Sequence, residues 1–194
     1  MTSLIRRSVA ALCCAAACVG LAGCTPPGRA VGDTQDRDAP VAFDGLDRGD
    51  VVIGYVGSDL TAMDSLMLDA FASAGLKAVY VPCASNDDPA AAAQGGVEDM
   101  AFRQVSIIMV ARLDAGGDAA GWDDALSEAR RAGIPVVLLD PLAAPDDDTL
   151  FAATFTVNDR AADATAIDDA VMTVIDDRPH EREMMVTTFV DGAG

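Results

Sequence analysis

The chain has 194 residues, with 13 lysines or arginines against 31 aspartates or glutamates, and a formal net charge of -18. This balance disfavours a nucleic-acid partner, because binding a polyanion requires a basic face that displaces its counterions. A hydrophobic fraction of 51% with only 5% aromatic residues predicts a core built mainly from aliphatic side chains and excludes disorder throughout. The length allows one ordinary domain with appendages.

The N-terminal segment has the features of an export signal. Arg6 and Arg7 precede a short uncharged apolar stretch that is too short to span a bilayer comfortably. The stretch ends in Leu-Ala-Gly-Cys at 21–24, which resembles the lipobox of bacterial lipoproteins, whose cysteine receives diacylglycerol. We therefore expect a lipoprotein signal peptide over 1–23, lipidation of Cys24 including palmitate, and a chain anchored at the extracytoplasmic face of the cell membrane. The alternative is an ordinary cleaved signal in which Cys24 only adjoins the cleavage site.

Cleavage before Cys24 would leave a more acidic chain that starts with a tether. It removes Arg6 and Arg7, so 11 basic residues remain against 31 acidic ones and the net charge becomes -20. Only Cys24 and Cys83 remain of the 5 cysteines, so no internal disulfide is expected once Cys24 carries lipid. Pro, Gly, Asp and Arg then occur without periodicity, which predicts a flexible tether over 24–49.

From residue 50 onward, short apolar runs alternate with helical patterns. A β-branched run at 51–56 predicts a strand, and the helix after it has an apolar face and ends at Gly75; that face comprises Leu60, Met63, Met67, Ala70, Phe71 and Ala74. Residues 78–81 predict a second strand. Asn-Asp-Asp-Pro at 86–89 has the capping residues and the proline that open a helix, which we expect to end near Phe102.

The second half of the chain continues the same alternation. Residues 105–110 and 135–139 are nearly continuous apolar runs, as expected of strands buried on both faces of a parallel sheet. The helix between them has one apolar face and ends at Gly133; that face comprises Trp122, Ala125, Leu126 and Ala129. Strands are also predicted at 151–157 and 184–190, around a last helix that starts near Asp159; its inner face comprises Ala162, Ala166, Ile167, Ala170, Val171 and Val174.

Regular alternation of strands and helices predicts the fold class α/β, with a doubly wound parallel sheet in three αβα layers over 50–194. Ligands of such sheets bind beyond the carboxyl ends of the strands. The loops at 57–60, 83–88, 111–117 and 140–144 are therefore the places where a site is expected.

Enzymatic motifs are missing from the sequence. His180 is the only histidine, and its polar surroundings favour a solvated turn residue over a catalytic base. Walker, Gly-x-Gly-x-x-Gly and Gly-x-Ser-x-Gly motifs are absent. One histidine and one cysteine outside the lipobox make a transition-metal site improbable, and the acidic run at 146–148 is better explained as a solvated loop than as a cation site. We expect a protein that is not an enzyme and has no cofactor.

The loop after the first strand offers Ser58 and Asp59. The simplest interpretation is a helix N-cap, because Ser and Asp are common there. As a ligand site the loop suits a neutral polyol better than a phosphate, because the Asp59 carboxylate would repel an anion.

The sequences GWDDAL at 121–126, EAR at 128–130 and AGIPVVLLD at 132–140 resemble a segment of the type I periplasmic binding proteins, in particular the ribose and galactofuranose receptors of bacterial ABC importers. The similarity extends over about residues 50–190. It implies α/β lobes that close in pairs on a sugar and deliver it to a membrane permease. Such receptors are commonly lipoproteins in Gram-positive bacteria, which agrees with the expected lipidation of Cys24.

The resemblance also implies ligand-binding residues. Asp140 matches the family's aspartate that accepts hydrogen bonds from sugar hydroxyls, although proline stands where an arginine usually follows. Ser58 and Asp59 stand where the family places residues that grip the sugar ring. Asn86 and Asp87 match a polar loop that often lines the cleft, and helix capping explains them equally well. Trp122 begins a helix within the matched segment, so its spacing favours packing over ligand contact.

Compared with this family, the chain has the length of the N-terminal lobe only. A lone lobe would leave one face of a sugar in water, so we expect monosaccharide binding that is weak or lost. The sequence therefore predicts a lipid-anchored sugar-binding protein related to the receptors of ABC importers, as a truncated or degenerate member, with an ABC permease as partner. The alternative is an envelope lipoprotein that uses the lobe as a protein-interaction scaffold.

Overall fold

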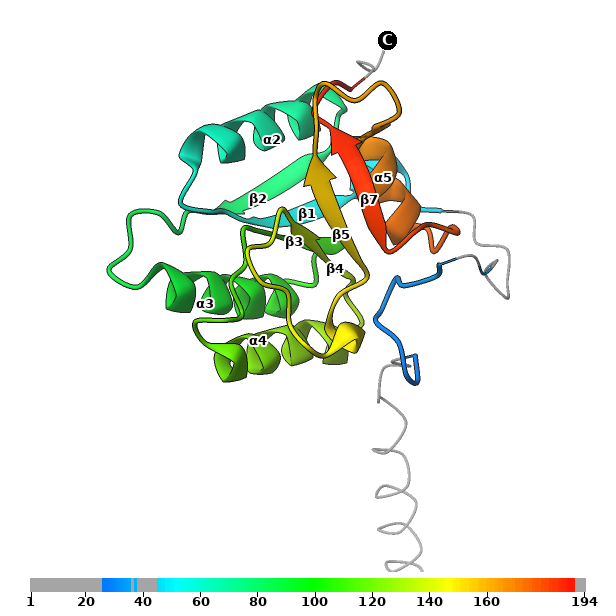
Figure 1. The fold of residues 1–194 in the computed structure, drawn as a ribbon. Coiled ribbons are helices and arrows are strands. Elements are labelled where there is room, and N and C mark those ends of the chain that lie inside the picture. Colours follow the sequence, from blue (N-terminus) through cyan, green and yellow to red (C-terminus); the bar gives the residue numbers. More distant parts are fainter. Residues whose placement is uncertain (1–25, 36, 38–44, 191–194) are drawn as a thin grey trace, which may run out of the picture.

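A sheet of seven parallel strands forms the centre of the domain (Figure 1). The computed structural model describes residues 26–35, 37 and 45–190, so the predicted signal peptide and Cys24 lie outside the described residues. The strands, in spatial order, are β2 (Lys77–Val81), β1 (Val52–Val56), β3 (Ile107–Ala111), β4 (Val136–Leu139), β5 (Ala153–Val157), β7 (Glu183–Thr187) and β6 (Thr165–Ala166). All neighbours pair in parallel.

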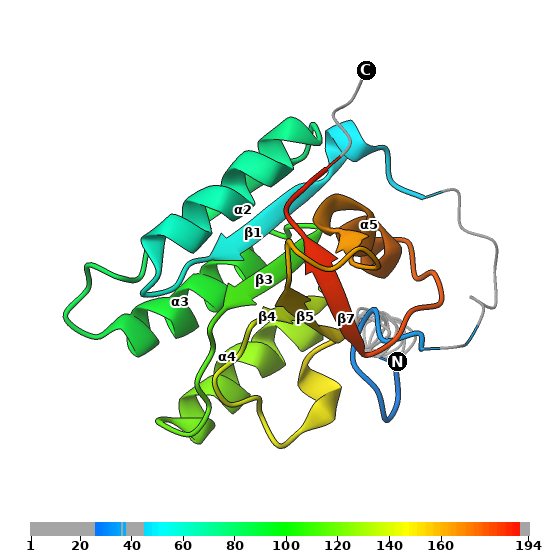
Figure 2. The same cartoon turned by 45° about the horizontal axis from the view of Figure 1, so that its top comes forward.

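Helices cover both faces of this sheet (Figure 2). On one face lie α2 (Thr61–Ser73) and α5 (Ile167–Ile175), and on the other lie α3 (Pro89–Phe102) and α4 (Ala119–Arg131). Two short 3-10 helices, η1 (Arg48–Asp50) and η2 (Asp148–Leu150), lie in the connections. The predicted fold class, a doubly wound parallel sheet in three αβα layers, is confirmed.

The side chains of the strands alternate between two cores. Tyr55 points toward the α2 and α5 face, where it meets Phe71, whereas Ile108 points toward the α3 and α4 face, where it joins Trp122. All five residues of β3 and all four of β4 are buried, because both strands lie in the middle of a sheet that is covered on both faces.

The last helix differs from its prediction. It begins at Ile167, and the predicted inner-face residue Ala162 lies exposed in the preceding loop. Asp159, expected at the helix start, accepts hydrogen bonds from the backbone nitrogen and hydroxyl of Thr188 and from the hydroxyl of Thr187 instead. These bonds hold the loop after β5 against the end of β7, and the helix begins only after this loop.

Part of the predicted tether packs against the amino ends of the strands. We call residues 26–35 the strap. Within it, Asp33 is buried and forms an ion pair of 2.9 Å with Arg182, and the Thr34 hydroxyl donates a hydrogen bond of 2.6 Å to the carbonyl of Arg178. Gly32 approaches the chain so closely that a Cβ there would lie 2.9 Å from that of Pro135, just before β4. The prediction of a flexible tether is therefore wrong for the strap.

His180 belongs to this contact. Its ring is buried, with Nε2 lying 2.8 Å from the carbonyl oxygen of Gly32 and Nδ1 lying 2.8 Å from that of Glu181. Its backbone nitrogen donates to the carbonyl of Gln35. The prediction of a solvated turn residue is wrong, because the strap covers the ring.

The chain also packs where it approaches β1. The guanidinium of Arg48 lies 2.5 Å from a carboxylate oxygen of Asp168 and 2.5 Å from one of Asp169, both at the start of α5. The backbone nitrogen of Leu46 donates to Asp176 at the other end of that helix. Residues 45–50 thus run along α5 and do not form a free tether.

Within the described ranges, we find no helix with the length and apolar character that crossing a membrane requires.

The core predicts a contrast between two leucines. Leu126 on α4 is fully buried and Leu66 on α2 is 54% exposed. Leu126→Ala should lower the free energy of unfolding by about 2–5 kcal/mol, because it removes buried methyl groups and leaves a cavity. Leu66→Ala should change it by less than about 0.5 kcal/mol. Urea unfolding followed by circular dichroism measures both, and equal effects would contradict the observed packing.

Candidate functional site

The strand order places a crevice between β1 and β3. The chain winds from β1 outward to β2 and then crosses back to β3, so the connections leave the two central strands toward opposite sides. Ligands of open parallel sheets bind at such a switch point, outside the carboxyl ends of the strands. The residues that follow these strands are Gly57 to Leu60 after β1 and Arg112 to Asp114 after β3.

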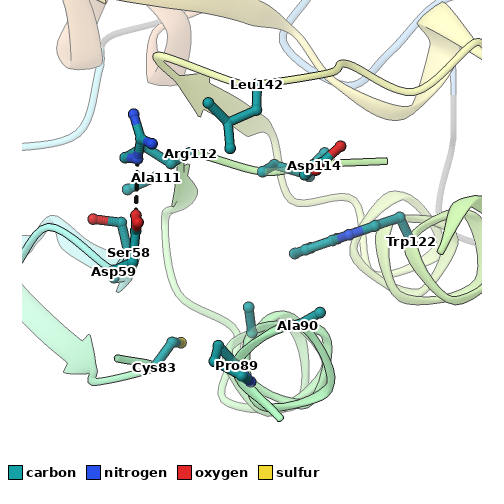
Figure 3. Close-up of a pocket in the computed structure, with 13 residues that line it drawn as sticks. Ser58, Asp59, Cys83, Pro89, Ala90, Ala111, Arg112, Asp114, Trp122 and Leu142 are labelled. Carbon is teal, nitrogen blue, oxygen red and sulfur yellow. Dashed lines mark hydrogen bonds and ion pairs between the residues drawn. The ribbon is translucent and has the colours of Figure 1, made fainter. Parts of the chain in front are cut away.

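A pocket of about 180 Å³ lies at this switch point (Figure 3). Its polar wall contains Ser58 and Asp59 from the loop after β1 and Arg112 and Asp114 from the loop after β3. Apolar atoms form the rest of the lining, which comprises Gly57, Cys83, Pro89, Ala90, Ala93, Ala111, Leu113, Trp122 and Leu142. The pocket is smaller than those that enclose drug-sized ligands, which are about 300–1,000 Å³.

A buried carboxylate shapes the loop after β1. Asp64 on α2 is 1% exposed and accepts hydrogen bonds from four donors. These are the backbone nitrogen (3.0 Å) and hydroxyl (3.0 Å) of Ser58, the hydroxyl of Tyr55 (3.2 Å) and the hydroxyl of Tyr80 (2.9 Å). A Cβ on Gly57 would lie 2.5 Å from the Tyr80 ring and 2.6 Å from an Asp64 oxygen, so only glycine fits there.

This network decides which ligands the loop can accept. A loop that binds phosphate turns its backbone N–H groups toward the anion. Here the N–H of Ser58 points to Asp64, and the Ser58 hydroxyl accepts from the backbone nitrogen of Leu60 at 2.9 Å. Ser58 therefore lines the pocket, although its polar groups are already paired. The predicted N-cap role is not observed, because Leu60 occupies the N-cap position of α2 without a side-chain bond.

Negative and positive side chains alternate next to the pocket, in the order Asp59, Arg112 and Asp140. Arg112 Nε donates to Asp59 at 2.8 Å, and Figure 3 shows this pair across the pocket from Trp122. Burial raises the pKa of Asp140, while a hydrogen bond from the backbone nitrogen of Val157 and the positive charge of Arg112 lower it in part. Arg112 therefore lies close enough to influence both carboxylates.

Arg112 is the residue that sequence reasoning missed. Pro141 stands where the family resemblance implies an arginine after Asp140, so no cation was expected at the site. Arg112 supplies one from the end of the neighbouring strand, where its backbone has a left-handed φ of 53°. It is the only basic residue in the four loops where a site was expected, which is the signal that could have identified it.

Asp140 lies at the carboxyl end of β4, as expected, but does not line the pocket. Its backbone nitrogen donates to the carbonyl of Phe155 and its Oδ1 accepts from Val157 at 3.2 Å. One carboxylate oxygen is therefore engaged in joining β4 to β5. Its other oxygen has no hydrogen bond among the described residues.

Asn86 and Asp87 lie in the exposed loop before α3 and do not line the pocket. The side-chain amide of Asn86 donates to the carbonyls of Pro82 (3.0 Å) and Cys83 (3.1 Å), which folds the loop on itself. Neither residue caps α3, because the capping carboxylate belongs to Asp88. The structure thus brings Ser58 and Asp59 together at the pocket, places Asp140 within the electrostatic influence of Arg112, and leaves Asn86 and Asp87 apart.

Trp122 packs in the core between α3, α4 and the sheet, as its spacing predicts, and the ring also forms one wall of the pocket. Asp118 begins its helix by accepting from the backbone nitrogen of Gly121 at 3.1 Å. A hydrogen bond from Gln94 on α3, followed by the bond from Gly121, lowers the pKa of Asp118. The wall is therefore fixed by both helices.

No three metal-binding side chains converge anywhere in the part of the chain that the structure describes. In the acidic run at 146–148, Asp147 accepts from the backbone nitrogen of Thr149 and caps η2.

The ionisation of two tyrosines reports on the hydrogen bonds to Asp64. Tyr55 and Tyr80 are the only tyrosines of the chain. Burial and the hydrogen bond to Asp64 raise the pKa of Tyr80 from 10.0 to about 12, and burial with the Asp64 charge raises that of Tyr55 further. Because the native state holds these protons more tightly, its stability is full below pH 10 and falls as the pH rises toward 12. An ultraviolet titration of tyrosinate should show almost no ionisation of native protein at pH 10.

Asp64→Asn should lower the pKa of Tyr80, because the negative charge is lost while burial remains. Asp69→Asn, which changes an exposed carboxylate on the same helix, should leave the titration unchanged. Half of the tyrosine signal appearing near pH 10 in folded wild-type protein would contradict the network.

In comparisons with known proteins, no protein-family model matches this chain, and no curated protein is significantly similar in sequence. Two solved structures are similar in part. One is a protein from Mycobacterium smegmatis in complex with β-D-fucofuranose, with 16% identity and a TM-score of 0.46, covering 71% of this chain and 54% of the other. The second is the periplasmic binding protein component of the arabinose ABC transporter from Shewanella sp. ANA-3, bound to α- and β-L-arabinofuranose. It has 16% identity and a TM-score of 0.45, covering 71% of this chain and 55% of the other. The chain thus spans about half the length of either protein.

Proposed function

We propose that this chain is a lipid-anchored sugar-binding protein that holds a neutral monosaccharide at the switch-point pocket, without catalysing a reaction. One observation carries the proposal: the Asp59 and Arg112 ion pair lies in the polar wall of a mostly apolar pocket where the winding of the sheet reverses. The resemblance of residues 121–140 to receptors of sugar importers supports it and suggests delivery to an ABC permease.

The chemistry of the pocket suits a polyol. Sugar hydroxyls both donate and accept, so a carboxylate and a guanidinium in one place can bond adjacent hydroxyls more strongly than neutral groups would. The apolar wall beside Trp122 suits the C–H face of a sugar ring. An anionic ligand is disfavoured, because Asp59, Asp114 and Asp140 all lie at the same edge.

The pocket can cover only one side of a ligand. Its walls come from one lobe, and a monosaccharide there would keep a face in water, which limits affinity. Binding is therefore weak unless a second lobe or a partner covers the pocket.

A second candidate is a scaffold that binds another envelope protein. Leu142, which lines the pocket, is 58% exposed, and Leu60 on the opposite loop is also exposed. These side chains offer apolar surface to a protein that covers the pocket. Crosslinking in intact cells separates the two candidates, because recovery of a permease that depends on added sugar favours the receptor.

Sugar binding can be tested by thermal unfolding with pentoses, hexoses and furanose sugars. A ligand at about 100 times its Kd stabilises the native state by about 2.7 kcal/mol. Arg112→Met should weaken binding by about 10- to 100-fold, since a hydrogen bond to a charged group contributes about 1.5–3 kcal/mol. Arg160→Met, which changes an exposed arginine outside the pocket, serves as the control. No shift with any sugar at millimolar concentration would refute sugar binding.

Lipidation can be tested separately. In a bacterial host that processes lipoproteins, the wild-type chain should incorporate an alkyne fatty acid and sediment with membranes. Cys24→Ser should abolish both, whereas Cys83→Ala should change neither, because Cys83 is buried in the domain. Label retained by the Cys24 variant would contradict the anchor.

A further inference from the structure

The strap keeps the proposed lipid on Cys24 close to the folded domain. Arg130 on α4 donates hydrogen bonds of 2.9 Å to the carbonyls of Pro26 and Arg29, so the packed structure begins at Pro26. Cys24 lies two residues earlier in the sequence, and two residues span at most about 7 Å. A lipid on Cys24 would therefore hold this end of the domain at the surface of the bilayer.

The surface next to Arg130 presents an exposed aromatic ring that suits a membrane contact. The carboxyl-terminal ends of α3 and α4 lie side by side there and enclose a shallow groove. Phe102, at the end of α3, is 87% exposed, the largest exposed fraction among the large apolar side chains of the described residues. Arg131 lines the same groove with Glu98 and Glu128 and pairs with Glu128 at 2.7 Å, while Arg103, next to Phe102, pairs with Asp99 at 2.8 Å. Aromatic rings and arginines are the side chains that settle at the bilayer interface. We call Phe102, Arg103 and Arg131 the anchor-side surface.

The distribution of charge bears on the orientation. Arginines at the amino ends of the strands are offset by acids, because Arg182 pairs with Asp33 and Arg178 pairs with Asp176. The loops at the opposite end carry Asp59, Asp87, Asp88, Asp114, Asp118 and Asp140 against Arg112 and Arg160. An anionic leaflet therefore repels the pocket end of the domain.

We infer that the strap and the anchor-side surface together seat the lobe on the lipid bilayer in one orientation, with the amino ends of the strands toward the lipid and the switch-point pocket facing away. The inference rests on the proposed lipidation of Cys24. A lobe of this size is about 40 Å across, so the pocket would stand well above the headgroups.

The orientation can be measured on the lipidated full chain reconstituted into vesicles that contain anionic lipid. Two variants carry a donor dye, Glu128→Cys at the anchor-side groove and Ser85→Cys in the loop after β2, and the vesicles carry an acceptor dye on lipid headgroups. Buried Cys83 stays unlabelled under native conditions. Energy transfer should be strong from position 128 and weak from position 85.

Two further changes test the cause. Twenty Gly and Ser residues inserted before Pro26 add about 25 Å of flexible reach and should reduce the difference between the positions. Phe102→Ser should also reduce it, whereas Leu142→Ser, an exposed leucine at the pocket, should not.

Each failure has its own signature. Equal transfer from both positions of vesicle-bound protein, or stronger transfer from position 85, overturns the orientation and leaves the anchor intact. A difference that survives both the insertion and Phe102→Ser also overturns it. Full binding of the Cys24→Ser variant to vesicles counts against the lipid anchor, and sugar binding is measured independently of either.

Discussion

The carboxylate of Asp64 is the interaction on which the site depends. A buried charge is costly unless hydrogen bonds replace its water, and here four donors do so, from β1, the loop after it and β2. Because the carboxylate sits on α2, the same contacts lock that helix to the two strands. They also occupy the polar groups of Ser58, which leaves Asp59, Arg112 and Asp114 as the charged side chains that line the pocket.

Six of the seven strands and the fold class could be predicted, because those strands are short apolar runs and helices α2, α3 and α4 follow recognisable patterns. The two-residue strand β6 was missed, because it lies within the predicted last helix. The hydrogen-bond network of Asp64 could not be predicted, although the position of this residue in the sequence gave an indication of it. Asp64 lies one turn from Met67 on the apolar side of its helix, where an acid is expensive without partners. The partners, Tyr55 and Tyr80, come from two strands, and their hydroxyls converge only when the sheet is formed. A predicted helix face shows that such a residue is buried, but it does not show what pairs with it.

The strap was mispredicted for the same reason. Its composition is that of a linker, and its local sequence has no periodicity. The groups that hold it, Arg182, His180 and the carbonyl of Arg178, lie about 145 residues further along the chain. Asp33 and Thr34 are ordinary linker residues until those partners fold into place. Composition therefore reports how a segment behaves alone, and long-range pairing overrides it.

The polarity of a parallel sheet joins these two ends of the molecule. Every strand runs in the same direction, so all amino ends gather at one end of the domain and all carboxyl ends at the other. The strap binds at the amino ends, next to Pro135 and Arg182, while the pocket opens at the carboxyl ends, next to Asp59 and Arg112. The proposed lipid on Cys24 would thereby be separated from the pocket by the length of the strands, and a partner could reach the pocket without passing that lipid.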